Sequence, residues 1–384
     1  MKLALRLSSL SILASVLSGA SFAGQFAPVS KYEVATGFSG YSVSLADFNG
    51  DGVLDLATTT EIPDSRVWIM LGNGDGTFQT AKAYVGSNVA IVRGVAAGDL
   101  NKDGKIDLAV ASSDSDGFAV NILLGNGDGT FGAPLAYAAG PFPTAVAVGD
   151  FNRDGNADLA VLSSDGGFAK GGVAVLLGNG DGSFQRYVSY SAGVNPNSIE
   201  IADFNGDAIP DIVVGTTGSV VSVLLGNGDG TFQKAIRDKI GVNPHYIGVG
   251  DFNNDGKVDV ITTLENTATQ QNKVVIALGK GDGSFQPPIT LPVPPKPQAT
   301  AVADFNLDGF QDIAIGIPKT PLDGIYFLLG RGNASFTQAG TYATGGLVPT
   351  ATAVGDLNGD GYPDLVMLDG GDSVEVLLNT GASR

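Results

Sequence analysis

DFNGDGVLD, residues 47–55, is the stretch that decides the fold, because six variants of it follow along the chain. They are DLNKDGKID (99–107), DFNRDGNAD (150–158), DFNGDAIPD (203–211), DFNNDGKVD (251–259), DFNLDGFQD (304–312) and DLNGDGYPD (356–364). Successive copies begin 52, 51, 53, 48, 53 and 52 residues apart. A period of this length is typical of architectures that repeat one supersecondary unit.

Each repeat contains four short runs that are typical of β-strands. In the third repeat they are 144–151, 158–164, 172–178 and 184–193, bounded by Gly, Asn and Asp. The GNGDG sequence at 178–182 carries Asn-Gly and Asp-Gly, the strongest short hairpin signals. Seven such units predict an all-β fold, a seven-bladed β-propeller of four-stranded antiparallel blades.

The two ends of the chain predict how the ring closes. The last repeat stops at VEVLLNTGASR (374–384) and lacks a fourth strand. The segment GQFAPVSKYEVATG (24–37) matches FGAPLAYAAG (131–140), which follows the second GNGDG turn. We therefore expect residues 26–37 to form the outer strand of the last blade, which would leave no open sheet edge.

The first 23 residues have the pattern of an export signal. Lys2 and Arg6 give a basic start, residues 7–17 are apolar or small, and Ser21-Phe22-Ala23 resembles a signal peptidase site. The alternative is a buried N-terminal helix. We expect a signal peptide over 1–23, a propeller over 24–384 and a secreted protein, periplasmic or on the cell surface in a Gram-negative bacterium. No later apolar run approaches the ~20 residues that span a bilayer, so membrane insertion is not expected.

Composition restricts the classes of partner and of chemistry. The 384 residues are 43% hydrophobic, include no Cys and one His, and carry a formal net charge of −18. Such an acidic surface repels nucleic acid and anionic lipid. Because the chain has no nucleophile elbow and no zinc motif, it is not expected to be an enzyme. An exported domain without disulfides is expected to use a metal as its stabiliser.

The nine-residue repeat has the pattern of a calcium loop. In D-x-N-x-D-G-x-x-D, oxygens at positions 1, 3, 5, 7 and 9 can converge on one cation, and Gly at position 6 permits the sharp turn. An all-oxygen set favours Ca²⁺. The alternative is an Asx-rich turn without metal, although three carboxylates would then repel one another in every copy. The expected ligands of up to seven Ca²⁺ ions are Asp47, Asn49, Asp51, Val53 and Asp55; Asp99, Asn101, Asp103, Lys105 and Asp107; Asp150, Asn152, Asp154, Asn156 and Asp158; Asp203, Asn205, Asp207, Ile209 and Asp211; Asp251, Asn253, Asp255, Lys257 and Asp259; Asp304, Asn306, Asp308, Phe310 and Asp312; and Asp356, Asn358, Asp360, Tyr362 and Asp364, with position 7 acting through its carbonyl.

These residues carry a family resemblance. DFNGDG followed by LGNGDGTF (71–78) resembles the FG-GAP repeat, also called VCBS, of integrin α-subunits and many exported bacterial proteins. The resemblance spans essentially all of 24–384 and implies a seven-bladed propeller with calcium between the first and second strands of a blade. Integrins carry the metal loop in only some blades and more often have Asp at position 3, where all seven repeats here have Asn. Related repeats occur in a sugar-binding lectin and in polysaccharide lyases, so the family does not fix the function.

Alternate connections between antiparallel strands emerge on opposite faces of a propeller. The nine-residue loops and GNGDG turns therefore share one nearly constant face, whereas the opposite face carries divergent loops such as 61–66, 265–273 and the Pro-rich 291–298. Divergent loops on a rigid scaffold are the usual layout of a binding surface. The residue six positions before each first Asp is expected at the channel rim on this variable face, unless it only caps a strand start. These residues are Tyr41, Arg93, Thr144, Asn197, His245, Gln298 and Thr350.

Two residues depart from the repeat pattern. Ala208 replaces the Gly at position 6, so the fourth blade should bind calcium most weakly if that position is left-handed. Glu200 stands where other repeats have Ala, Ser or Gly. It is interpreted as a carboxylate in a local ion pair or water contact, with a buried functional carboxylate as the alternative.

The leading interpretation is a monomeric, secreted, calcium-stabilised module for binding or cell adhesion, with an extracellular protein or glycan as its partner on the variable face. One alternative is a calcium-dependent lectin, which favours aromatic and amide side chains repeated at equivalent loop positions. Those repeats are not clear in the sequence. A further alternative is an enzyme similar to a polysaccharide lyase.

Overall fold

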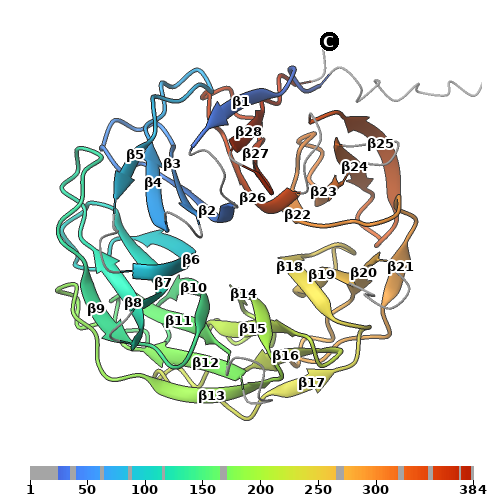
Figure 1. Cartoon of the computed structure of the whole chain (residues 1–384). Helices are drawn as coiled ribbons and strands as arrows, with labels where there is room; N and C mark the ends of the chain where they lie inside the picture. Colours follow the sequence, from blue (N-terminus) through green and yellow to red (C-terminus); the bar gives the residue numbers. More distant parts are fainter. Residues whose placement is uncertain are drawn as a thin grey trace, which may run out of the picture.

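The strands form seven antiparallel sheets of four strands each, arranged as blades around a central axis (Figure 1). This computed structural model describes residues 25–34, 40–60, 65–84, 89–114, 117–164, 171–264, 272–318, 324–344, 349–371 and 373–381. The expected signal peptide and most of the variable loops 61–66 and 265–273 lie outside these ranges. The prediction of an all-β, seven-bladed propeller is confirmed.

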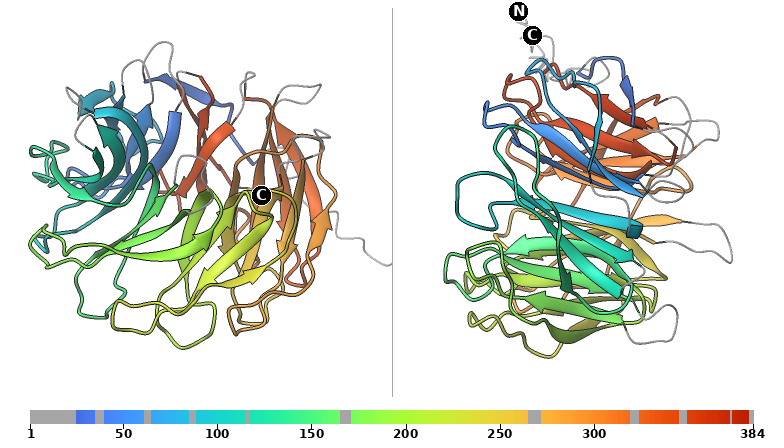
Figure 2. Two further views of the ribbon diagram at one scale, coloured as in Figure 1. Left: turned by 60° about the horizontal axis from the view of Figure 1, so that its bottom comes forward. Right: turned by 60° about the vertical axis from the view of Figure 1, so that its left-hand side comes forward.

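Each blade runs from an innermost strand at the channel to an outer strand at the periphery (Figures 1 and 2). The innermost strands are β2 (Gly40–Ala46), β6 (Val89–Gly98), β10 (Pro143–Gly149), β14 (Pro196–Ala202), β18 (Pro244–Gly250), β22 (Thr300–Ala303) and β26 (Pro349–Gly355). The second strands are β3 (Asp55–Thr60), β7 (Asp107–Asp114), β11 (Asp158–Ser163), β15 (Asp211–Thr216), β19 (Asp259–Leu264), β23 (Asp312–Ile317) and β27 (Asp364–Asp369). The third strands are β4 (Arg66–Met70), β8 (Gly117–Leu123), β12 (Gly171–Leu176), β16 (Val220–Leu224), β20 (Lys273–Ala277), β24 (Gly324–Gly330) and β28 (Ser373–Leu377). The outer strands are β5 (Lys82–Tyr84), β9 (Leu135–Ala138), β13 (Val188–Gly193), β17 (Ile236–Asp238), β21 (Ile289–Leu291), β25 (Phe336–Tyr342) and β1 (Ser30–Glu33).

The core lies between the faces of neighbouring blades. Second strands such as β11 and β15 are buried along their whole length, which explains why they read as continuous apolar runs. Leu162 and Val173 of the third blade pack in one cluster with Val214 of the fourth. Among the described residues, no helix is long and apolar enough to cross a lipid bilayer.

Neighbouring blades are also joined by a repeated contact between one nine-residue loop and the next GNGDG turn. Phe48, at position 2 of the first loop, is buried, and its carbonyl accepts the N–H of Gly129 in the second blade at 3.0 Å. The ring of Phe48 also lies edge-on to that of Phe131, with centroids 5.7 Å apart. The same main-chain bond runs from Gly76 to Leu357, Gly182 to Leu100, Gly230 to Phe151, Gly283 to Phe204 and Ala334 to Phe252.

The N-terminal segment completes the last blade, as predicted. Strand β1 pairs with β28, and blue β1 lies beside the dark red C-terminal strands in Figure 1. Phe26 takes the place of the missing turn phenylalanine and lies edge-on to Phe305 at 6.1 Å. The carbonyl of Phe305 accepts the side-chain amides of Gln25 and Asn379, each at 2.7 Å. Side chains from the two chain ends thus replace the main-chain N–H used at the other six junctions.

A buried charge cluster fixes the N-terminal strand in register. Lys31 lies opposite Glu375 across the β1–β28 pair. Its ammonium is 2.6 Å from Asp369 and 3.8 Å from Glu375, and both carboxylate side chains are at most 2% exposed. Burial opposes ionisation, but the hydrogen bond from Lys31 leads the interactions that hold the pKa of Asp369 below its ordinary value.

Replacing Lys31 with Met is expected to lower the free energy of unfolding by about 2 kcal/mol. This lies between the ~0–1 kcal/mol of an exposed ion pair and the ~3–5 kcal/mol of a broken buried pair, because the Lys31 side chain is 47% exposed. Urea unfolding would measure the loss. The matched control is Lys82→Met on the exposed part of β5, which should change stability by no more than about 0.5 kcal/mol. Equal losses in the two variants would contradict a role for the buried cluster.

Candidate functional site

Each nine-residue loop is a tight turn held by its own first aspartate. In the first blade, Asp47 accepts the N–H groups of Asp51 and Gly52 at 3.2 and 2.8 Å, and Asn49 Oδ1 accepts the N–H of Asp51 at 2.9 Å. Equivalent bonds recur in the other six loops. Asp and Asn favour this turn because their side chains satisfy main-chain donors that have no ladder partner.

Positions 4 and 6 of the loops have left-handed backbones. At position 6, φ is +84° for Gly52 and +62° for Ala208, which confirms the geometry expected for the fourth blade. Position 4 is also left-handed and holds Lys102, Arg153 and Leu307 at φ values of +58° to +61°. The sequence does not reveal position 4, because its residue type varies from repeat to repeat.

The ninth-position aspartates are buried and tie each loop to the turn that follows the third strand of the same blade, which in the last blade is the segment at Asn379. In the first blade, Asp55 accepts the N–H of Phe48 on one oxygen and that of Gly72 on the other, both at 2.8 Å. This bond confirms that the loop and the turn share one face. Burial raises the pKa of Asp158 to about 6 and that of Asp312 to about 7, and the carboxylates at positions 1 and 5 add to the rise.

The predicted calcium ligands are gathered in each loop but do not surround a common centre. Within the residues that the structure describes, no group of three or more Asp, Glu, His or Cys side chains could hold a metal ion. The carboxylates at positions 1 and 5 instead accept main-chain N–H groups, as Asp47 and Asp51 do. The chemistry of the donor set still fits a hard cation, because it consists of oxygens and, in addition to burial, the charges of Asp51 and Asp47 raise the pKa of Asp55. The assignment of these residues as ligands stays a prediction.

On the variable face, the innermost strands carry β-bulges at the mouth of the central channel. Six of the seven innermost strands have a β-bulge or similar register shift near the position where the sequence places a rim residue. The residues inserted in this way are Tyr41, Arg93 with Gly94, Thr144, Asn197, Tyr246 and Thr350. A bulge leaves one residue without a partner across the strands and re-aims its side chain. The bulges therefore collect six polar side chains of four types (Tyr, Arg, Thr and Asn) around one opening.

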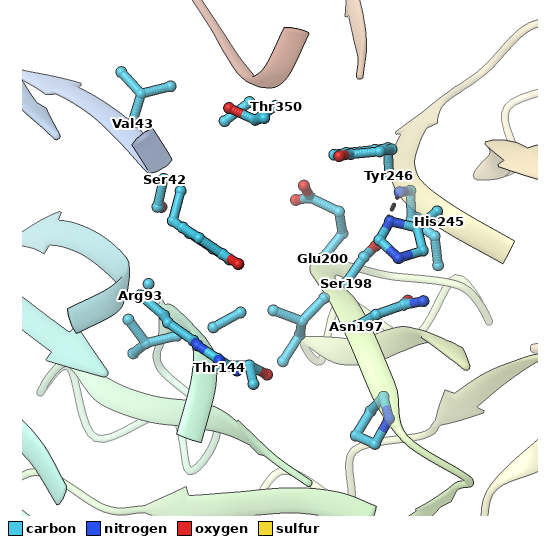
Figure 3. A pocket seen from close by; sticks show the side chains of 18 of the residues that line it. Ser42, Val43, Arg93, Thr144, Asn197, Ser198, Glu200, His245, Tyr246 and Thr350 are labelled. Atoms are coloured by element: carbon cyan, nitrogen blue, oxygen red, sulfur yellow. Dashed lines mark hydrogen bonds between the residues drawn. The ribbon is translucent and has the colours of Figure 1, made fainter. Parts of the chain in front are cut away.

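These side chains line a cavity of about 700 Å³ (Figure 3). The guanidinium carbon of Arg93 lies 5.6 Å from the centroid of the Tyr41 ring, and the rings of His245 and Tyr246 are 4.9 Å apart. Tyr246 has a φ of +50°, a strained value for an aromatic residue. Strain at a cavity wall is typical of a functional site rather than of a scaffold position.

Glu200 also lines this cavity, on β14 next to Ser198 and Asn197 (Figure 3). Its side chain is open to the water of the channel but enclosed by the surrounding strands, and this desolvation raises its pKa to about 7. Among the described residues it has neither a hydrogen-bond partner nor an ion-pair partner. Of the two contacts expected for Glu200, the local ion pair is therefore not formed within the described residues, and the water contact stays a prediction.

The structure places six of the seven predicted rim residues at the cavity and differs from the sequence count at two positions. Tyr41, Arg93, Thr144, Asn197, His245 and Thr350 line the cavity, whereas Gln298 does not. Strand β22 begins only at Thr300, and the main chain of Gln298 bonds to Gly316 before the strand starts. In the fifth blade the bulge falls at Tyr246, one residue after His245, so the sequence count missed Tyr246.

Comparisons with known proteins support this description. The model of the FG-GAP-like repeat matches residues 60–110, 99–161, 161–214, 203–262, 251–315 and 304–367, and the FG-GAP repeat model matches 39–70. The chain is 29% identical to integrin alpha-IIb of Homo sapiens over 218 residues, which cover 49% of this chain and 21% of the integrin. It is 27% identical to integrin alpha pat-2 of Caenorhabditis elegans over 220 residues, covering 46% and 18%. The match thus spans about a fifth of these relatives' length.

The fold is shared more widely than the sequence. Solved structures of BBS1N in complex with ARL6DN, soaked with lead or with mercury, superpose with a TM-score of 0.59 at 13% identity. The match covers 94% of this chain and 98% or 99% of that chain. At this identity the likeness concerns the fold alone.

Proposed function

The chain belongs to the FG-GAP-like repeat family, and from this premise we propose that it is a secreted, monomeric binding module whose ligand enters the mouth of the central channel. The partner is an extracellular protein or glycan, and the protein binds it without turning it over. The convergence of six polar side chains of four types on bulges around one cavity carries this proposal. A scaffold needs no such variation, whereas a specific site does.

The nine-residue loops lie on the opposite face, where they stabilise the propeller by binding calcium. Calcium binding is frequent in this family. In each blade the ligands would be the side chains at positions 1, 3, 5 and 9 and the carbonyl at position 7. A divalent cation there would offset the repulsion among the three carboxylates of a loop. It would also stiffen the junction through which position 2 contacts the next blade.

Ala208→Gly is expected to stabilise the fourth loop by roughly 1 kcal/mol, because Gly has no steric penalty at φ +62°. Calcium titration in a calorimeter should then show about a fivefold tighter weakest site, since 1.4 kcal/mol is tenfold. The reciprocal control is Gly256→Ala in the fifth loop. That residue has a φ of +78°, and an added Cβ would meet no atom within 4 Å, so only the backbone changes. If neither substitution changes the calcium affinity of its own loop, the residue at position 6 does not determine that affinity.

Binding by the channel mouth can be tested on arrays of glycans and extracellular proteins, with and without EDTA. Thr144→Trp should abolish binding by filling the cavity that Thr144 lines. The control is Gln79→Trp, which changes an exposed residue beside the GNGDG turn of the first blade. Binding of one glycan class alone would identify a lectin, and turnover of a polyuronate would identify a lyase. Binding that survives Thr144→Trp would exclude the channel mouth as the site.

A further inference from the structure

Among the described residues that line the cavity at the channel mouth, Glu200 is the one carboxylate and Arg93 the one arginine. The equivalent residues of the other innermost strands are Ser44, Ala96, Ala147, Gly248, Ala301 and Ala353. Small residues at six of these positions leave room around the seventh. Glu200 therefore projects into open space instead of packing against a neighbouring side chain (Figure 3).

The charge of Glu200 is not neutralised by the cavity itself. Arg93 is placed against the ring of Tyr41, and it lies across the opening from Glu200 in Figure 3. It is not among the groups that perturb Glu200, whose pKa is governed by desolvation alone. A carboxylate enclosed by protein without a counter-charge is costly to keep ionised, and a bound cation removes this cost.

We propose that Glu200 binds a primary ammonium group of the ligand that enters the channel mouth. This inference rests on the proposed function and adds the chemical class of the ligand. An ammonium carries three donors and no acceptor, and it is compact enough to reach a carboxylate set back from the rim. The formal net charge of −18 draws cations toward the protein. Tyr41 and Tyr246 add ring faces beside which a cation is favourable.

Three sources present this group: a lysine side chain, an amino sugar and a polyamine. The probes are acetyl-Gly-Lys-Gly-amide, a glucosamine tetramer and 1,5-diaminopentane, each compared with its N-acetylated form by calorimetric titration. At least one amine is expected to bind, and acetylation should abolish its binding. Glu200→Gln should weaken that binding by tenfold or more. Glu33→Gln, which removes the same charge from the exposed face of β1, should change it less than twofold.

Proton competition gives a second readout in the unaltered protein. The titratable and charged groups that share the cavity are Tyr41 on β2, Arg93 on β6 and His245 and Tyr246 on β18; β10, β22 and β26 contribute none. Affinity for the amine should fall as pH drops through about 7, and His245→Gln should keep this dependence. A saturating amine should also lower the Glu200 carboxyl pKa measured by NMR by at least one unit.

Two results would overturn the inference: an amine that binds Glu200→Gln as tightly as the unaltered protein, or no amine binding at millimolar concentration. If an uncharged glycan or a protein still binds and Thr144→Trp abolishes that binding, the channel mouth is the site and only the ammonium inference fails. If Thr144→Trp leaves every interaction intact, the proposed function itself fails.

Discussion

Transfer from 10 mM CaCl₂ to EDTA is expected to lower the unfolding temperature by well over ten degrees. With dissociation constants of about 10⁻³ to 10⁻⁴ M, each occupied site stabilises the native state by about 1.4–2.7 kcal/mol at this concentration. Seven sites together contribute about 10–19 kcal/mol. With an unfolding entropy of roughly 2.1 cal/mol/K per residue over about 360 residues, this corresponds to roughly 13–25 degrees.

Differential scanning calorimetry measures this shift directly. MgCl₂ at the same concentration is the control, because Mg²⁺ demands a regular octahedral site and gives up its water reluctantly. In the absence of metal, Asp47 and its equivalents cap their turns by accepting main-chain hydrogen bonds. Identical transitions in CaCl₂ and EDTA would show that these bonds are sufficient and that the loops are turns without metal.

Deletion of residues 24–36 is expected to cause aggregation or to abolish cooperative unfolding. The deletion removes strand β1 and so exposes the edge of β28. It also removes Phe26, which is buried against Phe305 and stacks on Phe327 with centroids 4.6 Å apart. The single change Phe26→Ala should already cost about 3–5 kcal/mol, as for other buried phenylalanines.

The control for this deletion is the chain that lacks only residues 1–23, which should fold as well as the full chain. Size-exclusion chromatography and urea unfolding distinguish the variants. A soluble chain without residues 24–36, equal in stability to the control, would show that the N-terminal segment is not needed to close the ring.

Much of the fold could be predicted because it depends on local sequence. The ninth aspartate of each loop is also the first residue of the second strand in every blade, from Asp55 to Asp364. The GNGDG turns likewise follow from residues that lie close together in the sequence, and the closing strand β1 follows from its match to the outer-strand segment of another repeat. Contacts between blades could not be predicted, because the carbonyl of Phe48 accepts a hydrogen bond from the N–H of Gly129 and no residue type marks a carbonyl acceptor.

The candidate site was predictable in position but not in detail. Counting back six residues from the first aspartate of each loop finds the channel mouth. In the fifth blade, however, the bulge falls one residue later, at Tyr246, which lies beside His245 in the cavity wall. The environment of Glu200 could not be inferred either, because it is formed by strands from several blades that lie far apart in the sequence. Whether the predicted calcium ligands of a loop point toward one metal ion depends on their side-chain rotamers, which their spacing in the sequence does not specify.

The contact between the first and last residues of the propeller makes the protein suitable for circular permutation. Thr380 donates its N–H to the carbonyl of Gln25 at 2.7 Å, so the two ends of the folded chain touch. A short linker can therefore join them, and the closed circle can be reopened at another junction of the ring. Each other junction is held by a main-chain bond that does not depend on side chains from a terminus. Circular permutants opened between blades would carry new termini on the face of choice, for fusion or display, while the blade order around the axis stays the same.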